Sequence, residues 1–504
     1  MKCARWKTAA FFAALVICVA WTGTASAQTT ISGGNIINQT WTTANDPYII
    51  QGDITIPSGS TLTIQQGVDV HIESGDVAGS GVDTGRTEIV VSGAIDVNGT
   101  SSNPVQFIPD TGTTGNNVNR GHWYGIRVTS SATQVDLAFA QVENGMTGLT
   151  VEGGGDAVDI SGGRFRNNYD DGIKIEDGSP VIDGAEIYHN GDFGVHVDDP
   201  GRLDLRNSIV RDNDDDGVVL EFPDNSSVSH VIDGATIHSN TDSGIYIYST
   251  YGTGTSLELK NTLVTQNGDH GMERYRSYGT VDVHHSNVWD NSTTNYDGVS
   301  ATGAGNLSTN PLYANAPNDL ALTSNSPARF NGDSGQDMGA VPYSGDATTN
   351  LTGYLWSDTT FSASGSPYTV TGDLTIPSGV TVTFEAGATM QIEGTDEMSA
   401  GTDRQRIEVE IEGTVDANGT SGSMVRFVPD TGTTGNNVNR GHWVGLRVHS
   451  GASAANLNYV DVQNGYTGLF TEVTGSVVDV TGGRFRNNYD DGIKIEDGSP
   501  VIDG

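Results

Sequence analysis

The chain has 504 residues, of which 67 are glycine, 7% are aromatic and 17% are charged. Its 62 Asp and Glu residues against 24 Lys and Arg residues give a formal net charge of −38, so its surface should repel nucleic acid and anionic membranes. Because no stretch is rich in Ala, Glu, Leu and Lys, we expect little helix.

The first 27 residues have the pattern of a secretory signal peptide. A basic start precedes the apolar run Ala9–Ala20, and Ala25-Ser26-Ala27 has the small residues of a cleavage site before Gln28. The apolar run is shorter than the roughly 20 residues that span a membrane. We therefore expect a secreted, extracellular or cell-surface protein with no membrane insertion in the mature chain. Both cysteines lie in the signal, so the mature chain has no disulfide.

The rest of the chain is a tandem duplication. Residues 162–184 recur letter for letter at 482–504, and the same offset of 320 relates 109–123 to 429–443. The second copy stops in the middle of a repeat, which we interpret as a sign that the sequence is a fragment of a longer protein. The predicted organisation is a signal peptide at 1–27, a first copy at 28–345, a linker at 346–352 and an incomplete second copy at 353–504.

A repeat of 22 to 27 residues organises the first copy. The motif Asn-x-x-x-Gly begins at Asn144, Asn168, Asn190, Asn213, Asn240 and Asn267, and most of its glycines precede an alternating apolar pattern such as Ile173 and Ile175. This period, without helical spacing, is typical of a β-solenoid with one coil per repeat. An inward Asn can bond to turn backbone and to the Asn of the next coil, about 4.8 Å away. We predict an all-β fold, a right-handed parallel β-helix solenoid in two tandem copies, the second truncated.

The unit Asn-x-x-x-Gly-[Ile/Val]-x-[Ile/Val] resembles the coil repeat of the pectate-lyase-like superfamily. The segment before Trp123 and the motifs between 310 and 340 are similar to the ends of bacterial secreted and surface β-helix proteins. The resemblance implies a β-helix, and it specifies fold more strongly than function.

Strand alternation predicts which side chains face outward. The residues two and four positions after each repeat glycine should form one flat face, with a column of carboxylates leading into tyrosines. Tyrosine suits the apolar faces of sugar rings, and carboxylates suit hydroxyls or bridging calcium. The predicted polysaccharide-binding residues are Glu152, Glu176, Asp198, Glu221, Tyr246, Tyr248 and Tyr275. The simpler alternative is a solvated strand surface. Arg274 falls at an inward position, where it must either distort the coil or close the core.

Two acidic patterns raise the question of calcium. Asp212, Asp214 and Asp216 lie in Asp-x-Asp-x-Asp-Gly, the opening of many calcium loops, although an EF-hand would need Glu where Pro223 stands. These three are the predicted Ca²⁺ ligands. A second acidic column follows each repeat asparagine by two residues, and its simplest explanation is that each Asp caps its own turn. Its members are Asp170, Asp192, Asp215, Asp242 and Asp269.

The resemblance also implies candidates for catalysis. Polysaccharide lyases of this fold pair a basic residue with carboxylate-bound calcium, and Lys174, beside His196, is the nearest analogue. Asp170 and Asp171 resemble the acid pair of polygalacturonases. However, the chain lacks the Trp-Ile-Asp-His segment of pectate lyases and the Gly-His-Gly of polygalacturonases. We therefore interpret the protein as a polysaccharide-binding matrix or adhesion component. The alternatives are a calcium-dependent polysaccharide lyase or other glycan-modifying enzyme, and a purely structural stalk.

Overall fold

The computed structural model describes residues 28–112, 119–153, 157–222, 227–249, 254–345, 351–431 and 439–504. The predicted signal peptide and most of the predicted linker lie outside the described residues. Apart from strands, these ranges contain two single 3-10 turns, η1 (Thr43–Asn45) and η2 (Ala363–Gly365). Among the described residues there is no helix with the length and apolar character needed to cross a membrane.

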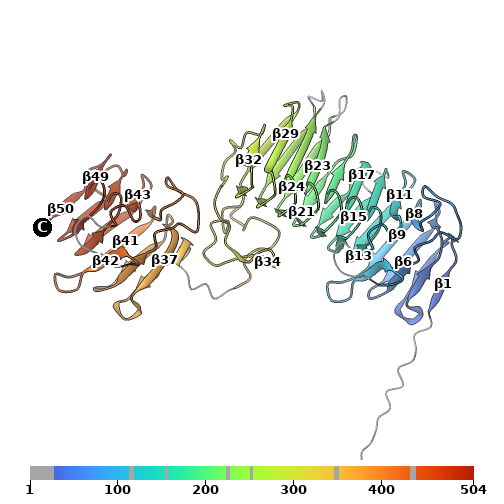
Figure 1. Ribbon diagram of the computed structural model, residues 1–504, viewed down its shortest axis with the longest axis horizontal. Helices are drawn as coiled ribbons and strands as arrows, with labels where there is room; N and C mark the ends of the chain where they lie inside the picture. The colour runs from blue at the N-terminus through green and yellow to red at the C-terminus, as the bar shows by residue number, and fades with distance from the viewer. Residues whose placement is uncertain are drawn as a thin grey trace, which may run out of the picture.

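Residues 29–297 form three long parallel sheets (Figure 1). A complete coil contributes one strand to each of the three sheets. The first sheet contains β1 (Thr29–Ile31), β4 (Tyr48–Ile50), β7 (Asp69–Ile72), β10 (Val105–Pro109), β13 (Ala140–Glu143), β16 (Arg164–Arg166), β19 (Glu186–Tyr188), β22 (Ile209–Arg211), β25 (Thr236–His238), β28 (Leu263–Thr265) and β31 (Asn287–Trp289). The second sheet contains β2 (Gly34–Asn35), β5 (Ile54–Ile56), β8 (Glu88–Val91), β11 (Gly125–Val128), β14 (Leu149–Glu152), β17 (Ile173–Asp177), β20 (Val195–Val197), β23 (Val218–Phe222), β26 (Ile245–Ser249), β29 (His270–Tyr275) and β32 (Thr294–Asp297). The third sheet contains β3 (Gln39–Trp41), β6 (Thr61–Gln65), β9 (Ala94–Asn98), β12 (Gln134–Ala138), β15 (Val158–Ser161), β18 (Val181–Asp183), β21 (Asp204–Arg206), β24 (Ser229–Asp233), β27 (Ser256–Lys260) and β30 (Thr280–His284).

Residues 351–503 form a second stack of parallel coils (Figure 1). Its larger sheet contains β35 (Leu351–Tyr354), β37 (Tyr368–Ile376), β39 (Thr389–Ile392), β40 (Glu408–Ile411), β42 (Val425–Pro429), β43 (Gly445–Val448), β45 (Val460–Gln463), β46 (Leu469–Thr471), β48 (Arg484–Arg486) and β49 (Ile493–Ile495). Its smaller sheet contains β36 (Thr359–Phe361), β38 (Thr381–Phe384), β41 (Thr414–Asn418), β44 (Ala454–Asn458), β47 (Val478–Thr481) and β50 (Val501–Asp503). The nine-residue β37 continues through the positions that correspond to β4 and β5, and so joins two sheets into one.

A ladder of buried asparagines runs along the first stack. The Asn190 side-chain oxygen accepts the backbone N–H and the side-chain amide of Asn168, at 3.2 and 2.8 Å. The Asn190 amide in turn donates to Asn213 at 2.9 Å and to the Phe165 carbonyl at 3.2 Å. The same pattern continues through Asn240, Asn267 and Asn291. The predicted role of these asparagines, bonding to turn backbone and to the next coil, is confirmed.

The inward apolar residues of the first stack form one continuous core, and Arg274 ends one of its rows. Ile247 pairs with Arg274 across β26 and β29, and the Arg274 guanidinium donates to the carbonyls of Tyr278 and Gly279 at 2.6 and 2.9 Å. The partial burial of this arginine lowers its pKa. The guanidinium at this inward position is therefore paired, as expected, because its polar head bonds to loop carbonyls.

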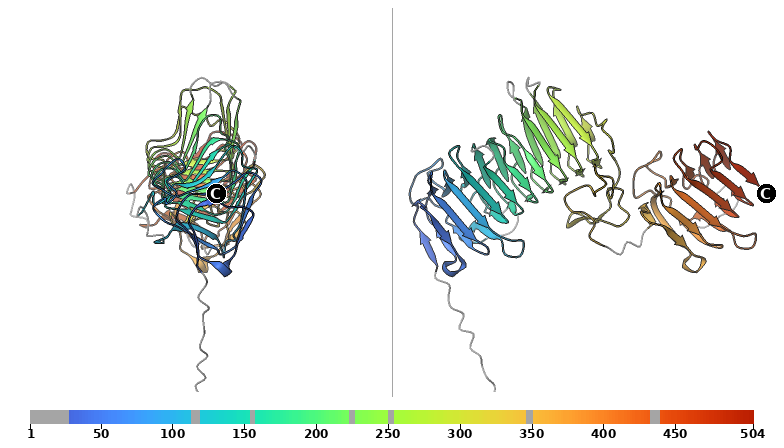
Figure 2. Two further views of the ribbon diagram at one scale, coloured as in Figure 1. Left: turned by 90° about the vertical axis from the view of Figure 1, so that its right-hand side faces the viewer. Right: turned by 180° about the vertical axis from the view of Figure 1, so that it is seen from behind.

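Residues 310–345, here called the closing segment, fold back beside the last coils of the first stack. β33 (Tyr313–Asn315) and β34 (Asp319–Leu322) form a small antiparallel sheet, and an apolar cluster joins the segment to Leu263. Figure 2 shows this segment between the two stacks of coils. The segment also meets the second stack, where the Trp356 indole donates to the Ser326 carbonyl at 2.9 Å. The closing segment therefore contacts both stacks of coils.

Candidate functional site

The outward face of the second sheet carries a registered row of side chains. One member comes from each of seven successive strands, β11 to β29: Arg127, Thr150, Lys174, His196, Val219, Tyr246 and Glu273. The predicted alternation is confirmed, since Ile173 and Ile175 are fully buried while Lys174 between them is partly exposed. The chemical character of the row changes along the sheet: it begins with Arg127, Thr150 and Lys174, continues with His196 and Val219, and ends with Tyr246 and Glu273.

A second row contains the predicted tyrosines. Glu221, Tyr248 and Tyr275 are registered partners across β23, β26 and β29. The rings of Tyr248 and Tyr275 are stacked, with centroids 5.6 Å apart and planes 4° from parallel. With Tyr246 beside them in the neighbouring row, they form an aromatic patch that is open to solvent.

The carboxylate column predicted ahead of these tyrosines is interrupted. The register between β14 and β17 shifts after Val151, so Glu152 pairs with Asp177 and not with Glu176. Glu152 turns instead toward Arg127, with 2.6 Å between their charged atoms. The prediction of one unbroken column was wrong at this step, because a one-residue irregularity displaces the following side chains.

Arg127 and Glu88 form a buried ion pair that the repeat pattern did not reveal. The Arg127 guanidinium lies 2.8 Å from the Glu88 carboxylate, whose side chain is fully buried. Glu88 also accepts the backbone N–H of Asp83 at 2.8 Å. Burial alone would lower the pKa of Arg127, but its contacts with Glu88 and Glu152 raise it. Glu88 lies before the Asn-x-x-x-Gly repeats begin, so the repeat gave no information about it. The sequence signal at this place was an acidic residue at the start of an otherwise apolar strand.

The candidate catalytic residues of the middle coils converge. His196 lies 2.9 Å from Asp198 and 3.4 Å from the buried Asp171, and the Lys174 ammonium lies 3.2 Å from Asp198. Glu176 approaches the same ammonium at 3.7 Å. Burial by itself would lower the pKa of His196, but the contacts with Asp171 and Asp198 raise it. The result is a chain of alternating charges across two coils.

Lys174 is held in its charged form. Burial tends to lower its pKa, but the bond to Asp198 and the charges of Asp198 and Glu176 raise it above the ordinary value. Burial and then the charge of the neighbouring Asp171 raise the pKa of Asp170 as well. For a carboxyl group this shift favours the neutral form, whereas for Lys174 it favours the charged form. The cluster therefore favours ion pairing over a free base at Lys174.

The three predicted calcium ligands are not brought together. Asp212 and Asp214 each contact an arginine, Arg211 and Arg120, at 2.5 Å. Asp216, in the same turn, is buried and accepts the backbone N–H of Ser243, in the turn of the next coil, at 2.8 Å. The three carboxylates are therefore held apart by different partners: two arginines and a backbone N–H of the next coil.

Asp216 instead joins the second acidic column. Carboxylate oxygens of Asp215, Asp216 and Asp242 lie within 4.8 Å of one another. Burial, followed by the charge of Asp192, raises the pKa of Asp215. Burial, followed by the charge of Asp215, raises the pKa of Asp216 to about 8. The explanation that each Asp caps its own turn does not address the closeness of Asp215, Asp216 and Asp242. Ionised carboxylates at this distance repel one another, and a proton or a cation would offset that repulsion.

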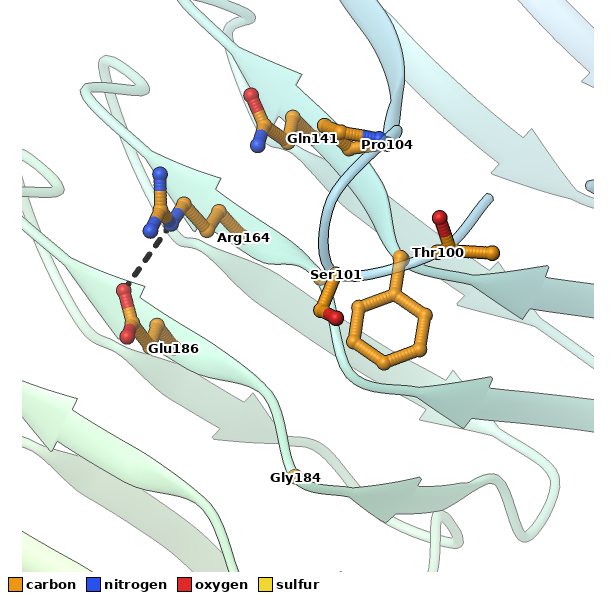
Figure 3. A pocket seen from close by; sticks show the side chains of 9 residues that line it. Thr100, Ser101, Pro104, Gln141, Arg164, Gly184 and Glu186 are labelled. Atoms are coloured by element: carbon orange, nitrogen blue, oxygen red, sulfur yellow. Dashed lines mark hydrogen bonds and ion pairs between the residues drawn. The ribbon is translucent and has the colours of Figure 1, made fainter. Parts of the chain in front are cut away.

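The hollow shown in Figure 3 lies away from this face. It has a volume of about 180 Å³ and is lined by residues of the first sheet and its turns, with an ion pair of 3.1 Å between Arg164 and Glu186. None of the predicted site residues lines it. This hollow and the predicted polysaccharide-binding residues therefore lie on different sheets.

Comparison with known proteins agrees with the fold. Residues 93–231 match the family model described as "Right handed beta helix region". A crystal structure of the pectate lyase Pel9A is 13% identical, with 74% of this chain and 69% of that chain covered and a TM-score of 0.28. No curated protein matches the chain. The stacked parallel coils and the family match define the chain as a right-handed parallel β-helix protein.

Proposed function

We propose that this protein is secreted and that the outward face of its second sheet binds polysaccharide as part of a matrix or adhesive surface. The observation that carries the proposal is the stacked pair Tyr248 and Tyr275, with Tyr246 beside it, on a flat and partly exposed sheet. Parallel aromatic rings offer apolar surface to sugar rings, and neighbouring carboxylates accept hydrogen bonds from sugar hydroxyls. The signal-like residues 1–27 support export.

The charges on the face favour a long chain ligand over a small molecule. Arg127 and Lys174 lie on one half, each already paired with carboxylates, so an acidic polysaccharide would have to share these ion pairs. Glu221 and Glu273 lie on the tyrosine half and suit neutral hydroxyls. Successive coils repeat these groups along the sheet, so several sugar units can bind at once.

We further propose that calcium binds beside this face, at Asp215, Asp216 and Asp242. The group offers carboxylate oxygens, which Ca²⁺ prefers, and Asp216 is buried among like charges that a cation would offset. The position replaces Asp212 and Asp214 of the sequence prediction, since arginines already neutralise those two. Calcium here would hold successive turns together next to the binding surface.

A glycan-modifying enzyme is the second candidate, and the observation that favours it is the convergence of Asp171, His196 and Asp198. A lyase base must lose its proton near the working pH, whereas the contacts of Lys174 keep it charged. The third candidate function, a structural stalk with no ligand, explains the stacked coils but gives no role to the exposed tyrosine stack.

Replacing Lys174 by alanine separates binding from catalysis. We expect Lys174→Ala to weaken binding of an acidic polysaccharide by less than about tenfold, since one exposed ion pair contributes at most about 1 kcal/mol. Binding and the release of unsaturated sugar ends would be measured on the same samples, with Arg164→Ala, in an exposed ion pair on the first sheet, as a control. If the wild type cleaves a uronate-containing polymer and Lys174→Ala binds it without cleavage, the enzyme candidate replaces the binding proposal.

A further inference from the structure

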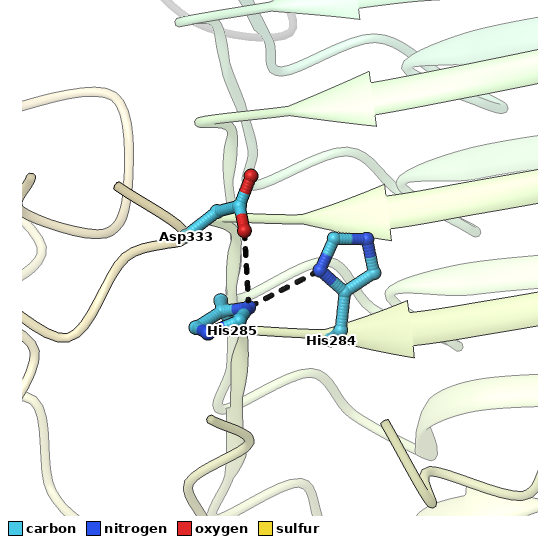
Figure 4. A group of neighbouring side chains, drawn as sticks. All are labelled: His284, His285 and Asp333. Carbon is cyan, nitrogen blue, oxygen red and sulfur yellow. Dashed lines mark hydrogen bonds and ion pairs between the residues drawn. The ribbon is translucent and has the colours of Figure 1, made fainter. Parts of the chain in front are cut away.

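Two histidines and an aspartate meet where the closing segment folds against the last coils (Figure 4). His284 ends β30 and His285 follows it, whereas Asp333 comes from the closing segment. The Nδ1 atoms of His284 and His285 are 3.2 Å apart, and His285 Nδ1 is 3.7 Å from an Asp333 carboxylate oxygen. One ligand atom from each of the three residues lies within 4.8 Å of the others.

The distance between the two ring nitrogens suits a shared metal ion. Nitrogen ligands bind zinc at about 2.0–2.1 Å, so two of them at a tetrahedral angle lie about 3.4 Å apart. Two imidazole nitrogens that face each other at 3.2 Å cannot both carry protons. A metal ion would accept both lone pairs, and the Asp333 carboxylate is close enough to complete a three-residue set.

A neighbouring carboxylate orients the first histidine. Glu258, on the adjacent strand β27, lies 3.3 Å from His284 Nε2. A proton on Nε2 donated to Glu258 leaves the lone pair on Nδ1, the atom that faces His285. Metal-binding histidines commonly have such a carboxylate partner on the other ring nitrogen, because it fixes the tautomer and the ring orientation.

The other two side chains are positioned by backbone and packing contacts. Asn261, in the coil before His285, accepts the backbone N–H of Asp333 at 2.7 Å and so places this residue beside the histidines. Its own carbonyl accepts the N–H of Gly339, also at 2.7 Å. Gly305 leaves the space that the His285 ring occupies, since any Cβ there would clash with the ring. The side chains of His284 and His285 keep 18% and 24% of their surface exposed, so an ion can reach them.

From these contacts we infer that His284, His285 and Asp333 form a binding site for a divalent transition-metal ion of the zinc type, which fastens the closing segment to the coil stack. Two imidazoles and one carboxylate suit zinc, nickel or copper, whereas calcium prefers oxygen ligands alone. Because the site joins β30 to the closing segment, the bound metal resists separation of the two. The closing segment also contacts the second stack, so the same ion stabilises the junction of the two copies.

The test measures zinc binding to the whole chain by calorimetry after treatment with a chelator, with Co²⁺ absorption as a report of tetrahedral nitrogen ligation. We expect one site of this type per chain, slower proteolysis of residues 310–345 with zinc, and loss of both effects in His284→Gln and His285→Gln. Glu258→Gln should weaken zinc binding by about 10–100-fold, as expected for an outer partner of a ligand.

Two further variants keep the proposal falsifiable if a histidine variant fails to fold. Asp333→Asn preserves the shape of the side chain and should weaken zinc binding and abolish the protection of the closing segment. His196→Gln removes a histidine from another cluster, where His196, Asp198 and Glu221 also come within 4.8 Å of one another, and should leave the Co²⁺ spectrum unchanged. Absence of zinc binding to the wild-type chain would overturn the assignment. So would a loss of zinc binding in His196→Gln that is not seen in the His284, His285 and Asp333 variants.

Discussion

Replacing Asn190 by leucine should lower the free energy of unfolding by about 1–3 kcal/mol. Leucine has a similar size but cannot accept the two bonds from Asn168 or donate to Asn213 and to the Phe165 carbonyl. The backbone N–H of Asn168 and the carbonyl of Phe165 would then lose these bonds in a fully buried place. Chemical denaturation of the whole chain measures the change.

The matched control for this variant is Asn98→Leu, because Asn98 is exposed at the end of β9 and its side-chain amide makes a long bond of 3.4 Å with the Asp96 carbonyl. Its stability should stay within about 0.5 kcal/mol of the wild type. Equal stability of the Asn190→Leu protein and the wild type would show that the buried ladder contributes nothing and would contradict the account of the fold.

Calcium at 100 times its dissociation constant should raise the free energy of unfolding by about 2.7 kcal/mol. The physical reason is that a cation offsets the repulsion among Asp215, Asp216 and Asp242. Melting curves in calcium and in chelator, at one ionic strength, give the measurement. Asp216→Asn should lose most of the effect, whereas Asp212→Asn should keep it because Asp212 is paired with Arg211.

The pH dependence offers an independent check on the calcium proposal. With a pKa of about 8, Asp216 holds a proton at neutral pH, and calcium must displace it. Calcium affinity should therefore rise as the pH approaches about 8 and level off above it. Identical melting curves with calcium and chelator across this range would mean that shared protons alone stabilise the acidic column.

The sequence was sufficient to predict those features that recur in every coil. The spacing of Asn144 to Asn267 predicted the ladder, and the alternation around Ile173 and Ile175 predicted which side chains face outward. Both follow from local geometry that each repeat imposes on the next. The stacked tyrosines at 248 and 275 were predictable for the same reason.

Features that occur once could not be predicted in this way. The shift after Val151 is a single irregularity that moves Glu152 away from Glu176, and no residue type announces it. Glu88 reaches Arg127 from the coil before, outside the repeated motif. Asp333 meets His285 only because the closing segment folds back, and no periodicity relates the two positions.

The measurement that tests the central claim most directly is binding of the whole chain to a panel of acidic and neutral polysaccharides, with an assay for new unsaturated ends on the same samples. We expect saturable binding without cleavage. Tyr248→Ala should weaken it about 2- to 13-fold, since an aromatic contact contributes about 0.5–1.5 kcal/mol, whereas Tyr169→Ala, at an exposed tyrosine outside the two rows, should bind as the wild type does. Absence of binding to every polymer, or equal binding by Tyr248→Ala and the wild type, would contradict the claim that this face is a polysaccharide-binding surface.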